Sequence, residues 1–218
     1  MNDDSTWQAQ VQGLEQNIAL SRQNSQLLLD AAQLRTGISL STENDSDLYQ
    51  RLELSGYPAK APAAGGHVLS IERQYFNPQG EALSLHDLRS GDLVLVHLAV
   101  RASQRVPDAL LVDLLPAGLE LENQNLANSS ANLSNASTEL RDWQEAMQNT
   151  DIVHQEYRDD RYVAALSIPA NEVKHILYLA RAVTPGHYMV PPAQVESMYR
   201  PAWHALSASE KPMRIRAR

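Results

Sequence analysis

The stretch from Lys174 to Tyr199, KHILYLARAVTPGHYMVPPAQVESMY, restricts the possible folds more than any other part of the chain. Along residues 176–183, aliphatic, aromatic and β-branched side chains alternate in a period of two, which is typical of a β-strand and not of a helix. The sequence Thr-Pro-Gly-His at 184–187 predicts a tight turn, because proline sets one backbone angle and glycine adopts angles that other residues resist. We therefore expect two long strands joined by this turn.

The second of these strands contains the two prolines at 191–192, which cannot donate hydrogen bonds to a neighbouring strand. We expect this strand to lie at a sheet edge or to leave the sheet at the prolines. Beyond them, Val195, Met198 and Tyr199 place large apolar side chains on a predicted exposed loop, and Trp203 follows closely. An exposed apolar loop usually covers another surface. The alternative is that this loop folds back on its own domain.

The sequence after residue 66 favours β-structure along most of its length. Residues 93–100, LVLVHLAV, form an unbroken apolar run that predicts a central strand covered on both faces. Residues 152–157 and 161–166 predict a hairpin around a charged turn, and residues 213–216 predict a final edge strand whose arginines protect the edge. We predict an all-β chain, an antiparallel β-sandwich with one short helix, preceded by a partial β-domain.

The one predicted helix covers residues 138–148. Ser137 or Thr138 can cap its first turn, and Leu140, Trp143 and Met147 lie on one face at helical spacing. We interpret Trp143 as an anchor in the core rather than as a ligand platform.

The clearest linker is the KAPAAGG segment, which offers no large apolar side chain for packing. We therefore divide the chain into a first domain at 1–58, a linker at 59–66 and a second domain at 67–218. The first domain reads as short strands, with a hairpin around the polar turn at 43–47. The alternative is a weak helix within residues 14–34.

Composition excludes several classes of function. The net charge of −8 argues against nucleic acid or an anionic membrane as the main partner, because both require a basic face. The chain has no cysteine, which excludes disulfides, thiolate metal sites, a cysteine nucleophile and a thioester within this chain. The longest apolar run is broken by His97 and is too short to span a bilayer. The first residues, MNDDSTWQAQ, are acidic and polar and do not resemble an export signal, so we expect either a cytoplasmic protein or a piece of a longer chain.

No catalytic, cofactor-binding or metal-binding residues are predicted. The seven histidines show no ligand spacing, and we interpret His97 as a hydrogen-bonded core histidine. The turn Arg158-Asp159-Asp160-Arg161 concentrates charge, but we expect its carboxylates to be solvated and ion-paired instead of doing acid–base work. No nucleophile or phosphate-binding motif occurs in the sequence.

Six separated blocks occur along the chain in the order SGYP at 55–58, SGDLVLV at 90–96, LLPAGLELEN at 114–123, YRDDRYVAAL at 157–166, YLARAVTPGHY at 178–188 and VESMYRP at 195–201. Taken together and in this order, these blocks resemble the C-terminal end of the bacterial α2-macroglobulins. This resemblance implies that the second domain is the last macroglobulin domain and that the first is the C-terminal half of a CUB-type β-domain.

The resemblance implies a role in protease inhibition. In this family a protease cuts a bait segment, the molecule rearranges, and an internal thioester from a Cys-Leu-Glu-Gln motif bonds the attacker. Here Gly13 stands where the cysteine of such a motif would be, so the tetrapeptide at 13–16 is a coincidence. We expect the last domain to shield the thioester domain of the same parent chain until the bait is cut. The expected shield is Met198 and Tyr199, supported by Tyr188, Met189 and Trp203.

The resemblance also implies a location and partners. It predicts a periplasmic lipoprotein, tethered to the inner membrane through the lipidated N-terminus of a parent chain, beside a class A penicillin-binding protein, where it defends the cell against host proteases. No nucleic acid, cofactor or direct membrane insertion is expected. The competing hypothesis is a stand-alone β-sandwich module that binds a glycan or a protein through a flat aromatic platform. An enzyme is the least favoured reading, since no catalytic constellation is present.

Overall fold

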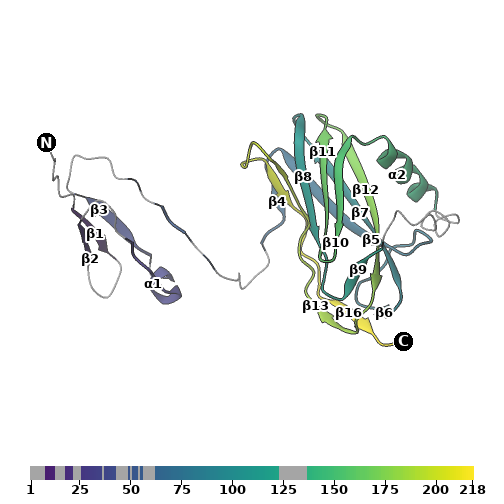
Figure 1. Ribbon diagram of the computed structural model, residues 1–218, viewed down its shortest axis with the longest axis horizontal. Coiled ribbons are helices and arrows are strands. Elements are labelled where there is room, and N and C mark those ends of the chain that lie inside the picture. Colours follow the sequence, from purple (N-terminus) through teal and green to yellow (C-terminus); the bar gives the residue numbers. More distant parts are fainter. Residues whose placement is uncertain are drawn as a thin grey trace. The chain divides into compact units, whose positions relative to one another are not determined.

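The computed structural model describes residues 8–12, 18–21, 26–35, 37–42, 49, 51–53, 55, 62–122 and 137–218. The chain divides into two compact units, Met1–Gly56 and Tyr57–Arg218, which we treat separately (Figure 1). The tetrapeptide at 13–16 and the predicted turn at 43–47 lie outside the described residues.

The first unit contains a three-stranded antiparallel sheet. Its order is β2-β1-β3, with β1 at Gln8–Gln12, β2 at Ile18–Ser21 and β3 at Ser39–Thr42. A short helix, α1 (Ala31–Arg35), begins after Asp30, whose carboxylate accepts hydrogen bonds from the N–H groups of Ala32 and Gln33, both at 2.8 Å. The predicted hairpin is wrong for the described residues, because β3 pairs with β1 and residues 51–53 form no strand.

The second unit is an antiparallel β-sandwich, which confirms the predicted fold class (Figure 1). One sheet has the order β10-β11-β8-β14-β15-β4, and the facing sheet has the order β5-β7-β12-β9. The first sheet comprises β10 (Ile152–Arg158), β11 (Arg161–Ile168), β8 (Val106–Leu114), β14 (Gln194–Ser197), β15 (His204–Leu206) and β4 (Gly65–Gly66). The second comprises β5 (Leu69–Phe76), β7 (Leu93–Ala102), β12 (Val173–Ala182) and β9 (Leu119–Leu121).

The core lies between these two sheets and is filled by alternate side chains of each strand. Along β5, buried and exposed residues alternate almost without interruption, as expected for a strand with one face on the core. β7 differs because residues 94–98 are all buried, which confirms the prediction of a strand covered on both faces. The predicted hairpin of β10 and β11 is also confirmed.

Helix α2 (Thr138–Gln148) covers the outer face of the four-stranded sheet (Figure 1). Its N-cap is Ser137, whose hydroxyl accepts a hydrogen bond from the N–H of Leu140 at 3.3 Å. Leu140, Trp143 and Met147 pack against Leu95 of β7 and against the leucines of β12. The predicted helix and the anchoring role of Trp143 are therefore confirmed.

The predicted pairing of the two strands around 184–187 is wrong. β12 pairs with β7 on one side and with β9 on the other, so no edge remains for the strand that follows it. That strand instead divides into β13 (Gly186–Tyr188), which joins a small separate sheet, and β14, which joins the six-stranded sheet beside β8. The prolines at 191–192 lie between them, where the chain leaves one sheet and enters another.

The small sheet has the order β13-β16-β6, with β16 at Met213–Arg216 and β6 at Leu88–Arg89. β16 pairs antiparallel with β13 and parallel with β6. The expectation of an edge strand at 213–216 is therefore wrong, since β16 is the central strand of this sheet. Its arginines point to the surface while Met213 and Ile215 are buried.

Candidate functional site

The predicted apolar loop is the connection between β14 and β15. Val195 and Ala205 face each other in the register of this hairpin and are fully buried, so its base is part of the core. The N–H of Ser197 donates to the carbonyl oxygen of Trp203 at 2.9 Å and closes the connection. The N–H of Met198 donates to the carbonyl oxygen of Asp108 at 3.0 Å and ties the hairpin to the beginning of β8.

The far end of the connection is a β-turn from Arg200 to Trp203. The N–H of Trp203 donates to the carbonyl oxygen of Arg200 at 2.8 Å, and Pro201 occupies the second position, which its fixed backbone angle favours. The ring of His204 donates through Nδ1 to the carbonyl oxygen of Pro201 at 3.0 Å. The Arg200 guanidinium lies 4.2 Å from the centre of the Trp203 ring.

Between these two anchors, the hairpin exposes two large apolar side chains. Tyr199 is 81% exposed and Met198 is 46% exposed. Trp203 packs partly against the core, and Val195, predicted in the loop, is buried in β14. Trp203 and Val195 therefore fold back on their own domain, as the alternative prediction stated, whereas Tyr199 projects from the domain.

Tyr188 and Met189 do not join this cluster. The ring of Tyr188 lies against Gly118, between β8 and β9, and Tyr188 pairs with Met213 of β16. Met198 instead lies beside Asp108, near the connection from β7 to β8. β12 runs between these two places, from its pairing with β7 to its pairing with β9, so the two groups occupy opposite ends of the sandwich (Figure 1).

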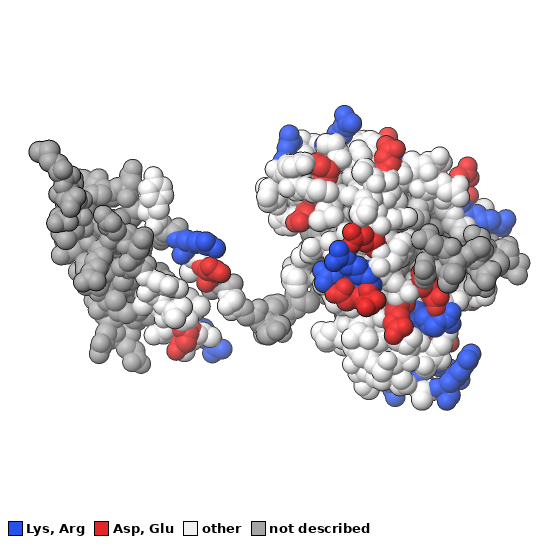
Figure 2. Space-filling model, in the orientation of Figure 1, with Lys and Arg blue, Asp and Glu red and all other residues white. Residues whose placement is uncertain are grey.

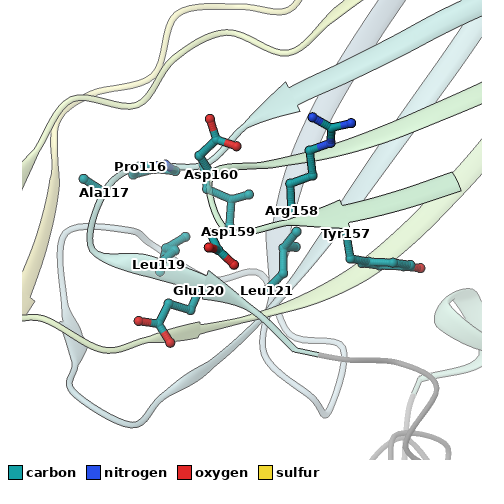
Figure 3. A pocket seen from close by; sticks show the side chains of 10 residues that line it. Pro116, Ala117, Leu119, Glu120, Leu121, Tyr157, Arg158, Asp159 and Asp160 are labelled. Atoms are coloured by element: carbon teal, nitrogen blue, oxygen red, sulfur yellow. The ribbon is translucent and has the colours of Figure 1, made fainter.

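A pocket that the sequence did not predict lies between the β8–β9 connection and the β10–β11 turn (Figure 3). Its volume is about 820 Å³, and its lining comes from residues 115–117, 119–121 and 157–160. Arg161 pairs with Asp160 at 2.6 Å, and this contact lowers the pKa of the Asp160 carboxyl. An exposed, ion-paired carboxylate stays ionised and is a poor general acid, so the expected solvated charge turn is confirmed for this pair.

Surface charge is mixed on the face that Figure 2 shows. Basic and acidic side chains are interspersed over the second unit instead of being separated into patches. This face therefore offers no broad basic surface of the kind that a polyanion requires.

A buried charge network joins the two sheets of the sandwich. The Arg73 guanidinium of β5 donates to one carboxylate oxygen of Asp113 in β8 at 2.5 Å and to the carbonyl oxygen of Pro191 at 2.7 Å. The Tyr178 hydroxyl of β12 donates to the other Asp113 oxygen at 2.6 Å. Burial raises the pKa of Tyr178 well above its ordinary value, which keeps the phenol a donor. The sequence does contain a signal of this network, because Arg73 in β5 and Asp113 in β8 are charged residues at positions that face the core.

His97 lies under helix α2 and is only 3% exposed. Its Nε2 is 2.9 Å from Nδ1 of His175, and its ring stacks on Trp143 with 3.8 Å between centroids. The interpretation as a hydrogen-bonded core histidine is confirmed. Within the described residues, no cluster of three or more histidine, cysteine or acidic side chains could hold a metal ion. Nor does this part of the chain include a helix long and apolar enough to cross a bilayer.

Two protein-family models match this chain. The family of the "Bacterial Alpha-2-macroglobulin MG10 domain" matches residues 69–202, and the "A2MG, CUB domain" family matches residues 5–68. The chain belongs to the bacterial α2-macroglobulin family. The resemblance seen in the sequence is thereby confirmed.

Two relatives show how much of an α2-macroglobulin this chain spans. The α2-macroglobulin of Escherichia coli (strain K12) is 50% identical over 211 residues, which cover 96% of this chain and 13% of the relative. The α2-macroglobulin of Xylella fastidiosa (strain Temecula1) is 41% identical over 175 residues, which cover 79% of this chain and 10% of the relative. The chain thus spans about an eighth or less of these relatives.

Solved α2-macroglobulin structures contain the same fold. Native E. coli α2-macroglobulin, from domain MG7 to the C-terminus, matches with a TM-score of 0.79 and 45% identity over 97% of this chain and 33% of that one. Salmonella α2-macroglobulin reacted with methylamine matches with a TM-score of 0.76 and 41% identity over 99% and 13%. Trypsin-activated E. coli α2-macroglobulin matches with a TM-score of 0.68 and 45% identity over 97% and 14%.

Proposed function

We propose that this chain is the C-terminal part of an α2-macroglobulin protease trap, an inhibitor rather than an enzyme, and that it shields the thioester domain of its parent. The main support for this proposal is the exposure of Tyr199 and Met198 at the tip of the β14–β15 hairpin. Apolar side chains in such a position favour burial against a second surface. Water and amines excluded from a thioester cannot attack it, so an apolar cover preserves the bond until activation.

The shield consists of Met198 and Tyr199, with Trp203 as its anchor in the core. Tyr188 and Met189 lie at the other end of the sandwich, so we leave them out of the proposed shield. The thioester itself comes from elsewhere in the parent, because this chain contains no cysteine. Structures of the relatives in native, methylamine-reacted and trypsin-activated forms support a parent that changes state when it is attacked.

The experiment measures how fast methylamine inactivates the thioester of the full-length parent. Thiol release is followed for the wild type and for a variant with Met198→Ala and Tyr199→Ala. The variant is expected to release its thiol faster, because amine and water reach the thioester through the opened contact. Met189→Ala is the matched control, since Met189 is 71% exposed at the opposite end of the domain. An unchanged rate in the double variant would show that the hairpin is not the shield.

The parent is further proposed to be a periplasmic lipoprotein that acts on invading proteases near a class A penicillin-binding protein. An immunoblot of source cells with antibody against this chain tests the central part of this proposal. A band many times larger than the chain, cut by added protease while its C-terminal epitope survives, is expected. A single band of the chain's own size would favour the stand-alone binding module. Against that module, Tyr199 is the only aromatic side chain classed as exposed among the described residues of the second unit, whereas a flat platform requires several.

A further inference from the structure

We propose that Arg200 is a positioning residue that holds Tyr199 in its shielding orientation by stacking on Trp203. This inference rests on the proposed function, because it concerns the same hairpin. Arg200 is exposed and charged, so it was not among the apolar residues that the sequence singled out.

The turn brings Arg200 and Trp203 together. Pro201 sets the turn, and the hydrogen bond from the Trp203 N–H to the Arg200 carbonyl closes it. The guanidinium then lies over the indole at 4.2 Å from its centre, a geometry in which the cation is attracted to the face of the ring. Because the indole is itself packed against the core, the arginine is attached to a fixed point of the domain.

Tyr199 lies between two such fixed points. On one side, the N–H of Met198 is bonded to the carbonyl oxygen of Asp108 in β8. On the other side, Arg200 is held by the turn and by its stack on Trp203. A residue between two anchored neighbours loses little conformational freedom when a partner covers it, so the contact is pre-organised. Loss of one anchor lets the Tyr199 ring leave the orientation in which it covers the thioester.

The test compares methylamine inactivation rates of the full-length parent carrying Arg200→Ala or Arg200→Lys. Arg200→Ala is expected to raise the rate by roughly two- to fivefold, the factor that corresponds to loss of one exposed cation–π contact. Arg200→Lys keeps a cation over the ring and is expected to restore most of the protection. Arg105→Ala is the matched control, because Arg105 is an exposed arginine on the β7–β8 connection at the same end of the sandwich. Its rate is expected to equal that of the wild type.

A double variant separates positioning from direct contact. In the Tyr199→Ala background there is no ring to position, so Arg200→Ala is expected to cause no further increase in rate. If Arg200→Ala raises the inactivation rate by the same factor in the Tyr199→Ala background as in the wild type, Arg200 itself contacts the thioester domain. That result would overturn the proposal. A wild-type rate for Arg200→Ala, alongside a faster Tyr199→Ala, would also overturn it while leaving the shield intact. A wild-type rate for Tyr199→Ala would refute the shield and this inference together.

Discussion

Replacement of Asp113 by asparagine is expected to be among the most damaging single substitutions in the second unit. Asp113 is fully buried, and its carboxylate accepts hydrogen bonds from Arg73 and from Tyr178, one on each oxygen. Asparagine keeps the shape of the aspartate side chain but removes its negative charge. Its NH₂ group would face either the Arg73 guanidinium or the Tyr178 hydroxyl, both of which are donors. The Arg73 guanidinium then remains buried without a counter-ion.

The magnitude follows from the cost of an uncompensated buried charge. Removal of one partner of a buried ion pair destabilises a protein by about 3–5 kcal/mol. The double substitution Arg73→Met and Asp113→Leu removes both charges at once. Its loss of unfolding free energy is expected to be much smaller than the sum of the losses from the two single substitutions. Some cost remains, because the Tyr178 hydroxyl and the Pro191 carbonyl lose partners, at about 1–3 kcal/mol each.

Urea denaturation of the full chain, followed by circular dichroism, measures these effects. Asp113→Asn is expected to lower the midpoint of the second unit by about 2 M, from the expected loss of stability and a typical urea slope. Asp160→Asn is the control, because it removes an acidic group from an exposed ion pair with Arg161 and is expected to leave the midpoint nearly unchanged. A loss below about 1 kcal/mol for Asp113→Asn, or strictly additive single and double variants, would refute the reasoning.

Two further predictions concern stability. Burial, with a smaller effect from His175, lowers the pKa of His97 from 6.5 to about 4, so the unfolded chain binds this proton first as the pH falls. The contribution of neutral His97 to the free energy of unfolding is fully present above pH 6.5 and decreases toward pH 4. The melting temperature should therefore fall less steeply over this range for His97→Gln than for the wild type. Equal slopes for the two proteins would contradict the lowered pKa of His97. A side chain at Gly118 would overlap the ring of Tyr188, so Gly118→Ala is expected to cost about 1–3 kcal/mol in urea denaturation. The additional substitution Tyr188→Leu should recover part of this loss, and no recovery would show that the ring is not the obstacle.

The strands of the second unit could be predicted because side-chain alternation is a local property. Each residue of a strand faces the side opposite to its neighbour, so burial on one face is visible in a short stretch. The unbroken apolar run of β7, the two strands of the β10–β11 hairpin around a charged turn, and the helical spacing of α2 are likewise local signals. The exposed tip at Met198 and Tyr199 was recognised because large apolar side chains are unusual in a proline-bounded loop.

The partners of the strands could not be read from the same signal. The alternation predicts one hairpin over residues 174–199, yet β12 is already paired on both sides and the following strands belong to two other sheets. The sequence places Tyr188 and Met189 near Met198 only because the three residues are close along the chain. The chain crosses from one end of the sandwich to the other between them.

The amino-acid sequence is sufficient to predict the β-class of this protein, helix α2, its family and the apolar residues at the hairpin tip. These follow from local periodicity and from blocks of sequence that are each read without knowledge of the fold. The ion pair of Arg73 with Asp113 in the facing sheet is visible only in the folded chain. The same is true of the contact of His97 with His175 and of the stack of Arg200 on Trp203. The physical reason is that hydrogen bonds and charge pairs depend on distance in space, and strand order, which sets that distance, leaves no periodic mark in the sequence.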